Sequence, residues 1–514
     1  MKSAKAHAFV LLTAAAVWLP ACGLNQAGVD PPDDTIAFPA SAVMDHSGDW
    51  LFVTNSNADL RYNDGTLVAF SLVRAAADRD PAVYPPWEPC SRVSYPNPRS
   101  DPKHFCCWDA LDRNILNCDE RGYVGPDDDI GNGDGNVRIG SFAAAMFLQP
   151  RECPKTFDPD CATLCDPAGV GDDHLLVGVR GDTSLTFVDV EPLDPATPQP
   201  RPPRLTCSSE TGEFLICDKD HSINKTGSAL ASPSPDAMPP EVTLPDEPYA
   251  LAYDDANGLL YVGHLTGNTA RPLSGGFSLF DVMPLGDAPL GTPRLIAPFP
   301  SPFGPNSVGS VGITSLKAYK PTDDMDRVIE GVTNIYASSR FVPQVAPLGV
   351  TADCPQPGSS VREIAAFPSG AYYTSPLAGS ETRGIEFVDG RVFVLQRSPP
   401  ALISFLNPYT PTEVLETCGN PTFLSQYDNG VETRLFVTCT SDGEIYVYDP
   451  SVPRLVQTFL VGRGPAGLVF DQEREVAYSV NFGDNGVAVI DLKRGSPTEY
   501  HVIQRIGFPR TIPR

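Results

Sequence analysis

The chain of 514 residues is acidic, with a formal net charge of −26, and it contains 54 prolines and 43 glycines. So negative a surface argues against nucleic acid as a partner and against a polybasic grip on anionic lipid. The prolines and glycines leave little room for long helices, so the fold must be rich in turns.

The first 21 residues have the form of a cleaved signal peptide. Lys2 and Lys5 begin it, and the apolar run 6–19 is shorter than the roughly 20 residues that a membrane-spanning helix needs. Residues 19–22 (LPAC) then resemble a bacterial lipobox, whose cysteine is diacylated and becomes the first residue of the mature chain. The alternative is an ordinary secretory signal with an incidental cysteine.

Residues 22–36 are expected to be a lipidated Cys22 followed by a flexible tether. The segment 23–36 is polar and rich in Pro and Asp, as a tether between a membrane anchor and a folded body should be. Gly23, and no aspartate, follows the cysteine. By resemblance to the sorting rule of Gram-negative lipoproteins, this favours the outer membrane, with the protein facing the periplasm or the cell surface.

Thirteen cysteines less Cys22 leave twelve, an even number in an oxidising compartment, which favours disulfides. Cys207 and Cys217 bracket a short segment with the form of a hairpin or tight loop. Cys418 and Cys439 flank a predicted antiparallel strand pair, where a cross-strand bridge is plausible. A zinc site is the alternative, but the cysteines lack paired Cys-x-x-Cys knuckles and supporting histidines.

One unit recurs along the chain: an apolar strand of the form Leu-Phe-Val, a polar turn, and an alternating strand that often ends in Asp. A lead-in strand after a Gly/Pro turn precedes each unit, and a fourth strand precedes that. Four short strands with turns between them are typical of a propeller blade, which packs both faces against neighbouring blades. The Leu-Phe-Val strands are predicted at 51–55, 175–177, 259–262, 392–394, 435–438 and 476–479, with a degenerate copy at 334–337.

Seven units predict an all-β fold, a single seven-bladed β-propeller over residues 37–514. Six or eight blades remain alternatives because the copy at 334–337 is weak. Seven blades of about 45 residues need only ~315 residues, so the surplus should form disulfide-rich loops on the propeller faces. These insertions are 73–136, 150–172, 193–240, 319–331 and 351–381.

Both chain ends are predicted to meet at one blade junction. Residues 500–509 have the phase of a fourth strand followed by the turn that opens another blade, and the next lead-in strand, 39–44, lies near the N-terminus. We therefore expect the last blade to be finished or flanked by both ends, which seals the ring.

The strand 51–55 (LFVTN), with its glycine-led alternating continuation, resembles the YVTN-type β-propeller family. The resemblance covers most of the mature chain and is weak over 294–350. It implies the propeller fold but little about function, because these propellers serve binding, surface and enzymatic roles.

Calcium is a possible cofactor, and the segment 127–136 is where it would bind. Hard oxygen ligands at alternating positions suit Ca²⁺, and the glycines let a loop wrap the ion. The candidate ligands are Asp128, Asn132, Asp134 and Asn136. The closing glutamate of an EF-hand loop is missing, so an acidic turn with no ion is the alternative.

The sequence holds no HExxH, Gly-x-Ser-x-Gly, Walker or dinucleotide motif. By resemblance, some seven-bladed relatives are lactonases or lyases that use Glu, His and Asp around the central channel. Glu386, on a predicted innermost strand, and His264, just past a second strand, are the candidates here. For each, the alternative is a solvated polar residue at a strand end.

We expect a monomeric, non-catalytic propeller that binds a protein or glycan partner and touches the membrane only through its lipid. This accounts for the anchor, the large loops and the missing catalytic motifs. The alternatives are a hydrolase or lyase with a site at the channel mouth, and a structural part of an envelope assembly. Carboxylates and histidines clustered at one mouth would favour the enzyme, and an exposed aromatic patch would favour binding.

Overall fold

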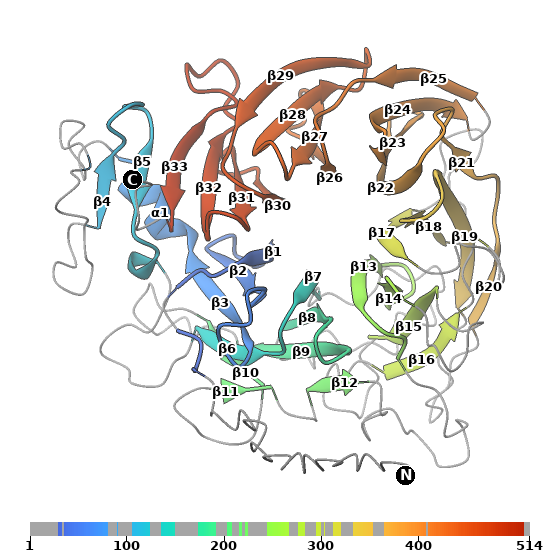
Figure 1. Ribbon diagram of the computed structural model, residues 1–514, viewed down its shortest axis with the longest axis horizontal. Coiled ribbons are helices and arrows are strands. Elements are labelled where there is room, and N and C mark those ends of the chain that lie inside the picture. The colour runs from blue at the N-terminus through green and yellow to red at the C-terminus, as the bar shows by residue number, and fades with distance from the viewer. Residues whose placement is uncertain are drawn as a thin grey trace, which may run out of the picture.

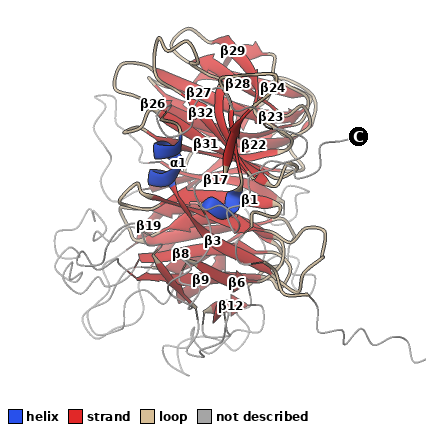
Figure 2. Cartoon of the chain, turned by 90° about the vertical axis from the view of Figure 1, so that its left-hand side faces the viewer, coloured by secondary structure: helices blue, strands red, loops and turns tan. Residues whose placement is uncertain are grey.

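Seven β-sheets surround a central axis, so the predicted seven-bladed propeller is confirmed (Figure 1). Strands are the dominant secondary structure of the computed structural model, as the side view shows (Figure 2). The structure describes residues 29–32, 35–80, 90, 105–123, 135–149, 173–191, 203–207, 215–217, 221–224, 244–266, 276–282, 294–299, 303, 312–319, 333–352, 364–407 and 410–507.

The first three blades begin at their innermost strands and run outward. Blade 1 contains β1 (Pro39–Met44), β2 (Trp50–Asn55), β3 (Gly65–Ser71) and β6 (Asn136–Ile139), with β11 (Leu215–Ile216) at its outer edge. Blade 2 contains β7 (Ala143–Leu148), β8 (Asp173–Val179), β9 (Ser184–Glu191) and β10 (Arg204–Thr206), and β12 (Ser222–Asn224) also pairs with β9. Blade 3 contains β13 (Pro248–Asp254), β14 (Leu259–His264), β15 (Phe277–Asp281) and β16 (Arg294–Phe299).

The next three blades follow the same plan. Blade 4 contains β17 (Ile313–Tyr319), β18 (Thr333–Ser339), β19 (Gln344–Ala352) and β20 (Ile364–Pro368), and β21 (Tyr373–Thr374) also pairs with β19. Blade 5 contains β22 (Ser380–Val388), β23 (Arg391–Ser398), β24 (Pro400–Asn407) and β25 (Thr410–Leu415). Blade 6 contains β26 (Pro421–Asp428), β27 (Thr433–Cys439), β28 (Glu444–Asp449) and β29 (Arg454–Leu460).

Blade 7 carries two additional strands at its outer edge. Its own strands are β30 (Pro465–Asp471), β31 (Val476–Asn481), β32 (Gly486–Asp491) and β33 (Val502–Ile506), and β5 (Leu116–Cys118) and β4 (Cys106–Trp108) follow. The described helices are α1 (Leu72–Asp78) and the short 3₁₀ helix η1 (Glu120–Gly122). No helix within the described ranges is long and apolar enough to span a membrane.

Alternate side chains of a second strand pack against different neighbouring blades, which explains the apolar runs of the repeat. In β2, Leu51 and Val53 join the core between blades 1 and 7, where Tyr478 of β31 is also buried. Phe52 lies between them and joins the core between blades 1 and 2, together with Val177 of β8. A lone unit would leave both faces exposed, so each blade depends on its neighbours.

The described part of the insertion 73–136 adds strands to the rim of blade 7, rather than forming a loop on a propeller face. We call residues 105–123 the clasp. Its strand β5 runs parallel to β33, where Gln504 is opposite Leu116. The Gln504 side chain is fully buried and donates from Nε2 to the Tyr123 hydroxyl at 3.1 Å. The sequence did not indicate these strands, because pairing between such distant segments leaves no local pattern.

Blade 7, which contains the last strand β33, lies beside blade 1, which contains the first strand β1, as the sequence predicts (Figure 1). Strand β1 packs beside β30, and the rings of Phe38 and Phe482 are 5.3 Å apart. Arg474 of blade 7 donates to the Gly48 carbonyl at 2.6 Å and to Asp49 at 3.1 Å. The clasp adds ladder hydrogen bonds across the same junction.

Four disulfides lie within the described residues. Cys207–Cys217 joins the end of β10 to β11 with Cα atoms 4.5 Å apart. Cys418–Cys439 joins the segment before β26 to the end of β27 at 5.8 Å. These are the two bridges expected from the sequence. The other two hold the clasp and are Cys90–Cys107 and Cys106–Cys118.

Candidate ligand site at the channel mouth

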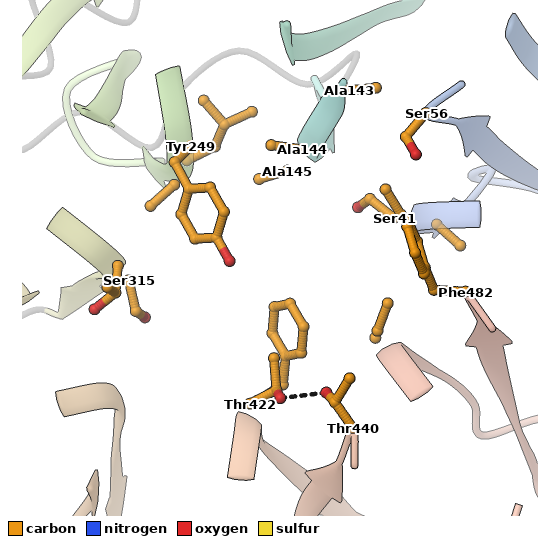
Figure 3. Close-up of a pocket in the computed structure, with 18 of the residues that line it drawn as sticks. Ser41, Ser56, Ala143, Ala144, Ala145, Tyr249, Ser315, Thr422, Thr440 and Phe482 are labelled. Carbon is orange, nitrogen blue, oxygen red and sulfur yellow. Dashed lines mark hydrogen bonds between the residues drawn. The ribbon is translucent and has the colours of Figure 1, made fainter. Parts of the chain in front are cut away.

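A cavity of about 470 Å³ occupies one mouth of the central channel (Figure 3). This is the mouth at which the innermost strands of the blades begin. The turns between second and third strands complete the wall, with Ser56 from blade 1, Arg180 from blade 2 and Phe482 from blade 7. The cavity is therefore built by all parts of the ring.

Each innermost strand has a β-bulge close to its beginning. In blade 3, for example, Pro248 and Ala250 are opposite the adjacent residues His264 and Gly263, which leaves Tyr249 without a partner. A bulge kinks the strand and re-aims the side chain of the additional residue. The residues at these bulges all line the cavity: Ala40, Ala144 with Ala145, Tyr249, Thr314, Arg383, Thr422 and Ala466.

A residue in the left-handed backbone region lies two positions before each bulge. Its φ is between 51° and 82° in the seven blades, and only two of these residues are glycines. Other L-residues adopt this region rarely, since it crowds the Cβ atom against the backbone. Because this conformation recurs in all seven blades, it is a regular feature of the turn that leads the chain into the channel mouth. The residues are Phe38, Phe142, Glu247, Gly312, Glu381, Asn420 and Gly464.

Hydroxyl groups of the second strands satisfy amides that the bulges leave outside the ladder. The Ser41 amide donates to Thr54 Oγ1 at 3.1 Å in blade 1. The Phe423 amide donates to Thr438 Oγ1 at 3.2 Å in blade 6. A buried amide without a partner would destabilise the strand by about 1–3 kcal/mol, so these buried threonines stabilise the bulges.

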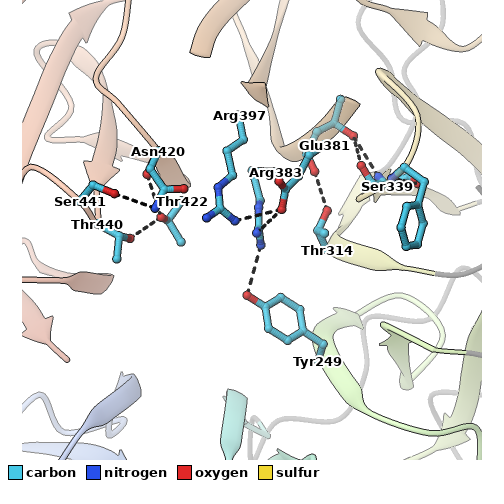
Figure 4. Close-up of polar contacts among 12 residues, drawn as sticks. Tyr249, Thr314, Ser339, Glu381, Arg383, Arg397, Asn420, Thr422, Thr440 and Ser441 are labelled. Atoms are coloured by element: carbon cyan, nitrogen blue, oxygen red, sulfur yellow. Dashed lines mark hydrogen bonds and ion pairs between the residues drawn. The ribbon is translucent and has the colours of Figure 1, made fainter. Parts of the chain in front are cut away.

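Blades 3 to 6 give the mouth a polar sector, formed by Tyr249, Thr314, Arg383 and Thr422. Arg383 donates from Nη1 to the Tyr249 hydroxyl at 3.3 Å and from Nη2 to Glu381 (Figure 4). The Arg383 side chain is only 9% exposed, and its Nε has no hydrogen-bond partner among the described residues.

A second guanidinium shares the same carboxylate. Arg397, near the end of β23, donates from Nη1 to the Glu381 oxygen that also accepts from Arg383, at 3.0 Å. Figure 4 shows the two arginines beside each other, with Arg397 on the side of Thr422. The group of Arg383, Arg397 and Glu381 therefore carries one net positive charge.

A separate ion pair borders the polar sector at blade 2. Arg180 donates from Nη2 to Glu247 at 2.8 Å. Its guanidinium carbon lies 5.9 Å from the centre of the Tyr249 ring, within cation–π range. This ion pair is electrically neutral. Its guanidinium packs against the Tyr249 ring from blade 2.

Blades 7, 1 and 2 give the mouth an alanine sector, whose bulges carry Ala466, Ala40 and the pair Ala144 and Ala145. The aromatic rings of Phe142 and Phe482 lie in the same part of the wall. The bulge side chains are apolar here, in contrast to the opposite half of the ring, although Ser41, Ser56 and Arg180 of blades 1 and 2 also line the cavity.

The structure places the two catalytic candidates on different blades, and neither is among the lining residues. Glu386, on β22, is 6% exposed and forms an ion pair with Lys317 Nζ at 2.8 Å. Burial raises the pKa of Glu386, with a smaller opposing effect of Lys317. His264 is fully buried, with its Nε2 2.9 Å from Ser278 Oγ, and burial lowers the pKa of His264 to about 3.

The calcium candidates and the lipidation site fall mainly outside the described residues. Cys22, Asp128, Asn132 and Asp134 lie there, whereas Asn136 begins β6 and is buried. Across the described ranges, no group of three or more His, Cys, Asp or Glu residues could hold a metal ion.

The fold defines the class of the protein as a seven-bladed β-propeller. No family model and no curated protein matches the chain. Among solved structures, it is similar to a functionally unknown protein from Desulfotomaculum acetoxidans, at 11% identity over 71% of this chain and 90% of that one, with a TM-score of 0.39.

Two further solved structures have equally distant sequences. A putative 6-phosphogluconolactonase from Bacteroides uniformis is 12% identical over 66% of this chain and 79% of that one, with a TM-score of 0.35. A catalytically inactive virginiamycin B lyase from Staphylococcus aureus, solved with quinupristin, is 10% identical over 88% and 94%, with a TM-score of 0.39. Likeness at this level carries no argument about function.

The sequence patterns had not marked Arg383, Arg397, Tyr249 and Arg180 as ligand-site residues. A usable signal existed for the tyrosine, because proline stands between the left-handed residue and the bulge in Glu247-Pro248-Tyr249. The same spacing recurs as Phe38-Pro39-Ala40, Asn420-Pro421-Thr422 and Gly464-Pro465-Ala466. Blade 5 has no such proline, so nothing local marks Arg383.

Proposed function

We propose that the chain is an exported, lipid-anchored binding propeller that receives an organic group in the cavity at the channel mouth. The group belongs to a free small molecule or to the end of a glycan or protein chain. The cavity carries the proposal: its volume of about 470 Å³ lies in the range of small-molecule sites, about 300–1,000 Å³.

The chemistry of the wall supports binding over catalysis. A lactonase- or lyase-like site needs a carboxylate or histidine that reaches the substrate. The described lining residues contain neither of these, and the nearby Glu247 and Glu381 are occupied by arginines. Hydroxyls, guanidiniums and aromatic rings remain, which orient a ligand through hydrogen bonds and apolar contact.

A capture experiment tests this function. Mature protein is incubated with an organic extract of the producing cells' envelope, washed, denatured and assayed for released compounds by mass spectrometry. The Ala144→Trp variant fills the cavity and should lose the compound that wild type retains. Val414→Trp, at a half-exposed site on the outer strand β25, should retain it. Equal retention by Ala144→Trp and wild type would contradict a ligand site in this cavity.

A separate experiment tests the proposed lipid anchor on Cys22. Cys22→Ser should move the protein from the membrane fraction to the soluble fraction and abolish labelling by a fatty-acid probe. Retention of the variant in membranes, together with an unlabelled wild type, would contradict lipidation.

A further inference from the structure

We propose that the polar sector binds the carboxylate of a monoanionic ligand through Arg383, together with Arg397, which lies beside Arg383 on Glu381 but is not itself among the lining residues. The ligand's apolar body then lies against the alanine sector. The inference rests on the proposed function, because it names the chemistry of the ligand for the same cavity.

The sign of charge in the wall is opposite to that of the whole chain. The chain has 63 acidic and 37 basic residues, and its net charge is −26. The described lining residues nevertheless include Arg180 and Arg383 and no Asp or Glu. A concave site lined by one sign of charge concentrates ligands of the other sign, so this cavity favours anions.

The number of charges fits one carboxylate. Arg383 and Arg397 share Glu381 and keep one positive charge between them, while Arg180 and Glu247 cancel each other. A monocarboxylate would neutralise the remaining charge. A phosphate dianion would leave a negative charge in a partly buried site.

The donors that would hold the carboxylate are already oriented. A guanidinium has five N–H donors in a plane that matches a carboxylate, and the described partners of Arg383 are Glu381 and Tyr249. Its side chain is nine-tenths buried, so water cannot freely satisfy the remaining donors. Figure 3 shows the Tyr249 hydroxyl directed into the cavity, with the Thr422 hydroxyl across from it.

The rest of the wall suits an apolar body. Phe142, Phe423 and Phe482 line the cavity with the alanines of blades 7, 1 and 2. A ligand with an aromatic or branched apolar part would bury it there while its carboxylate reaches blade 5. The two sectors thus select the two ends of one molecule.

Three probes with one body and different head groups test the inference: 3-phenylpropanoate, 3-phenylpropanamide and 3-phenylpropylamine. Titration calorimetry on the mature protein should show the carboxylate binding at least about tenfold more tightly than the amide. The amine should not bind. Added salt should weaken the carboxylate more than the amide, because only the carboxylate relies on charge attraction.

Variants assign the effect to the arginine pair. Arg383→Gln and Arg397→Gln should each remove the preference for carboxylate over amide. Glu381→Gln should increase that preference, because it leaves both guanidiniums without their internal counter-ion. Arg454→Gln makes the same charge change on the exposed outer strand β29 and should change nothing. If Arg383→Gln does not fold, Arg397→Gln decides, since its side chain is 31% exposed.

Equal affinity for carboxylate and amide, or a preference that survives Arg397→Gln, would overturn the inference. Failure of all three probes to bind at about 10 mM would also overturn the inference, because even millimolar affinity is visible at that concentration. The proposed function would still stand if Ala144→Trp abolished capture from the extract. It would fall if Ala144→Trp captured the compound as wild type does.

Discussion

The two halves of the channel mouth share one backbone plan and differ in the side chains placed on it. In blades 3 to 6 the bulges present Tyr249, Thr314, Arg383 and Thr422. In blades 7, 1 and 2 they present alanines. The left-handed residue and the bulge recur in all seven blades, so this backbone conformation does not by itself define the ligand site. It supplies seven positions, and the sequence makes four of them polar.

The alanine sector includes the junction between blades 7 and 1, the first and last blades of the chain, where β1 packs beside β30. The polar sector lies in blades 3 to 6, away from this junction.

Removing residues 500–514 should have the largest effect, because it takes away the strand that joins blade 7 to the clasp. The deletion takes away β33, in which Val502 and Ile506 are almost fully buried. Each such side chain contributes about 1.5–3 kcal/mol, against a total stability of roughly 5–15 kcal/mol. We expect unfolding or aggregation, measured by circular dichroism melting and size-exclusion chromatography.

A matched change at another outer strand is the control for this deletion. Leu460→Ser, at a 67% exposed position on β29, should melt with wild type. If the deleted protein also melted like the intact one, β33 and the clasp would have no part in closing the ring.

A pair of aspartate substitutions tests whether the bulges aim side chains at the cavity. Ala69→Asp places a charge in the sealed core of blade 1, where alanine is 1% exposed, and should lower the free energy of unfolding by more than about 3 kcal/mol. Ala144→Asp should change it by less than about 1 kcal/mol, because the new carboxylate faces a hydrated cavity. Urea denaturation measures both. Equal losses would mean that Ala144 belongs to the core.

His264, buried behind the polar sector, should make stability fall as pH decreases. Its pKa is about 3 in the folded protein and 6.5 when the chain is unfolded, because burial disfavours the charged ring. Below pH 6.5 the unfolded chain therefore gains a proton that the folded protein does not accept. Each pH unit from 6 to 4 should lower the free energy of unfolding by up to about 1.4 kcal/mol.

The His264→Gln variant isolates that slope, since it removes the titrating ring. Its stability should vary less between pH 6 and 4 than that of wild type. This window stays above the range in which Asp189 titrates, because hydrogen bonds and charge from two histidines outweigh burial and lower the pKa of Asp189 to about 2. Identical slopes for the two proteins would show that His264 accepts a proton without unfolding.

The strands could be predicted from the sequence, whereas the polar sector could not. The strands expected at 39–44 and 51–55 lie in β1 and β2, since the apolar residues that mark a strand are present in the local sequence. A bulge instead depends on the register with a partner strand. The contact of Arg383 with Tyr249 joins residues 134 positions apart, which only the closed ring brings together.

The clasp imposes an order on assembly. Its disulfides join cysteines only 12 and 17 residues apart, so they can form before the C-terminal blades have emerged. Gln504, which contacts the clasp, lies 386 residues after Cys118 and arrives last. A hairpin held by these disulfides can therefore form before β33 is available to pair with it. When β33 pairs with β5, it joins the C-terminal blade to a segment inserted in blade 1 in a single step.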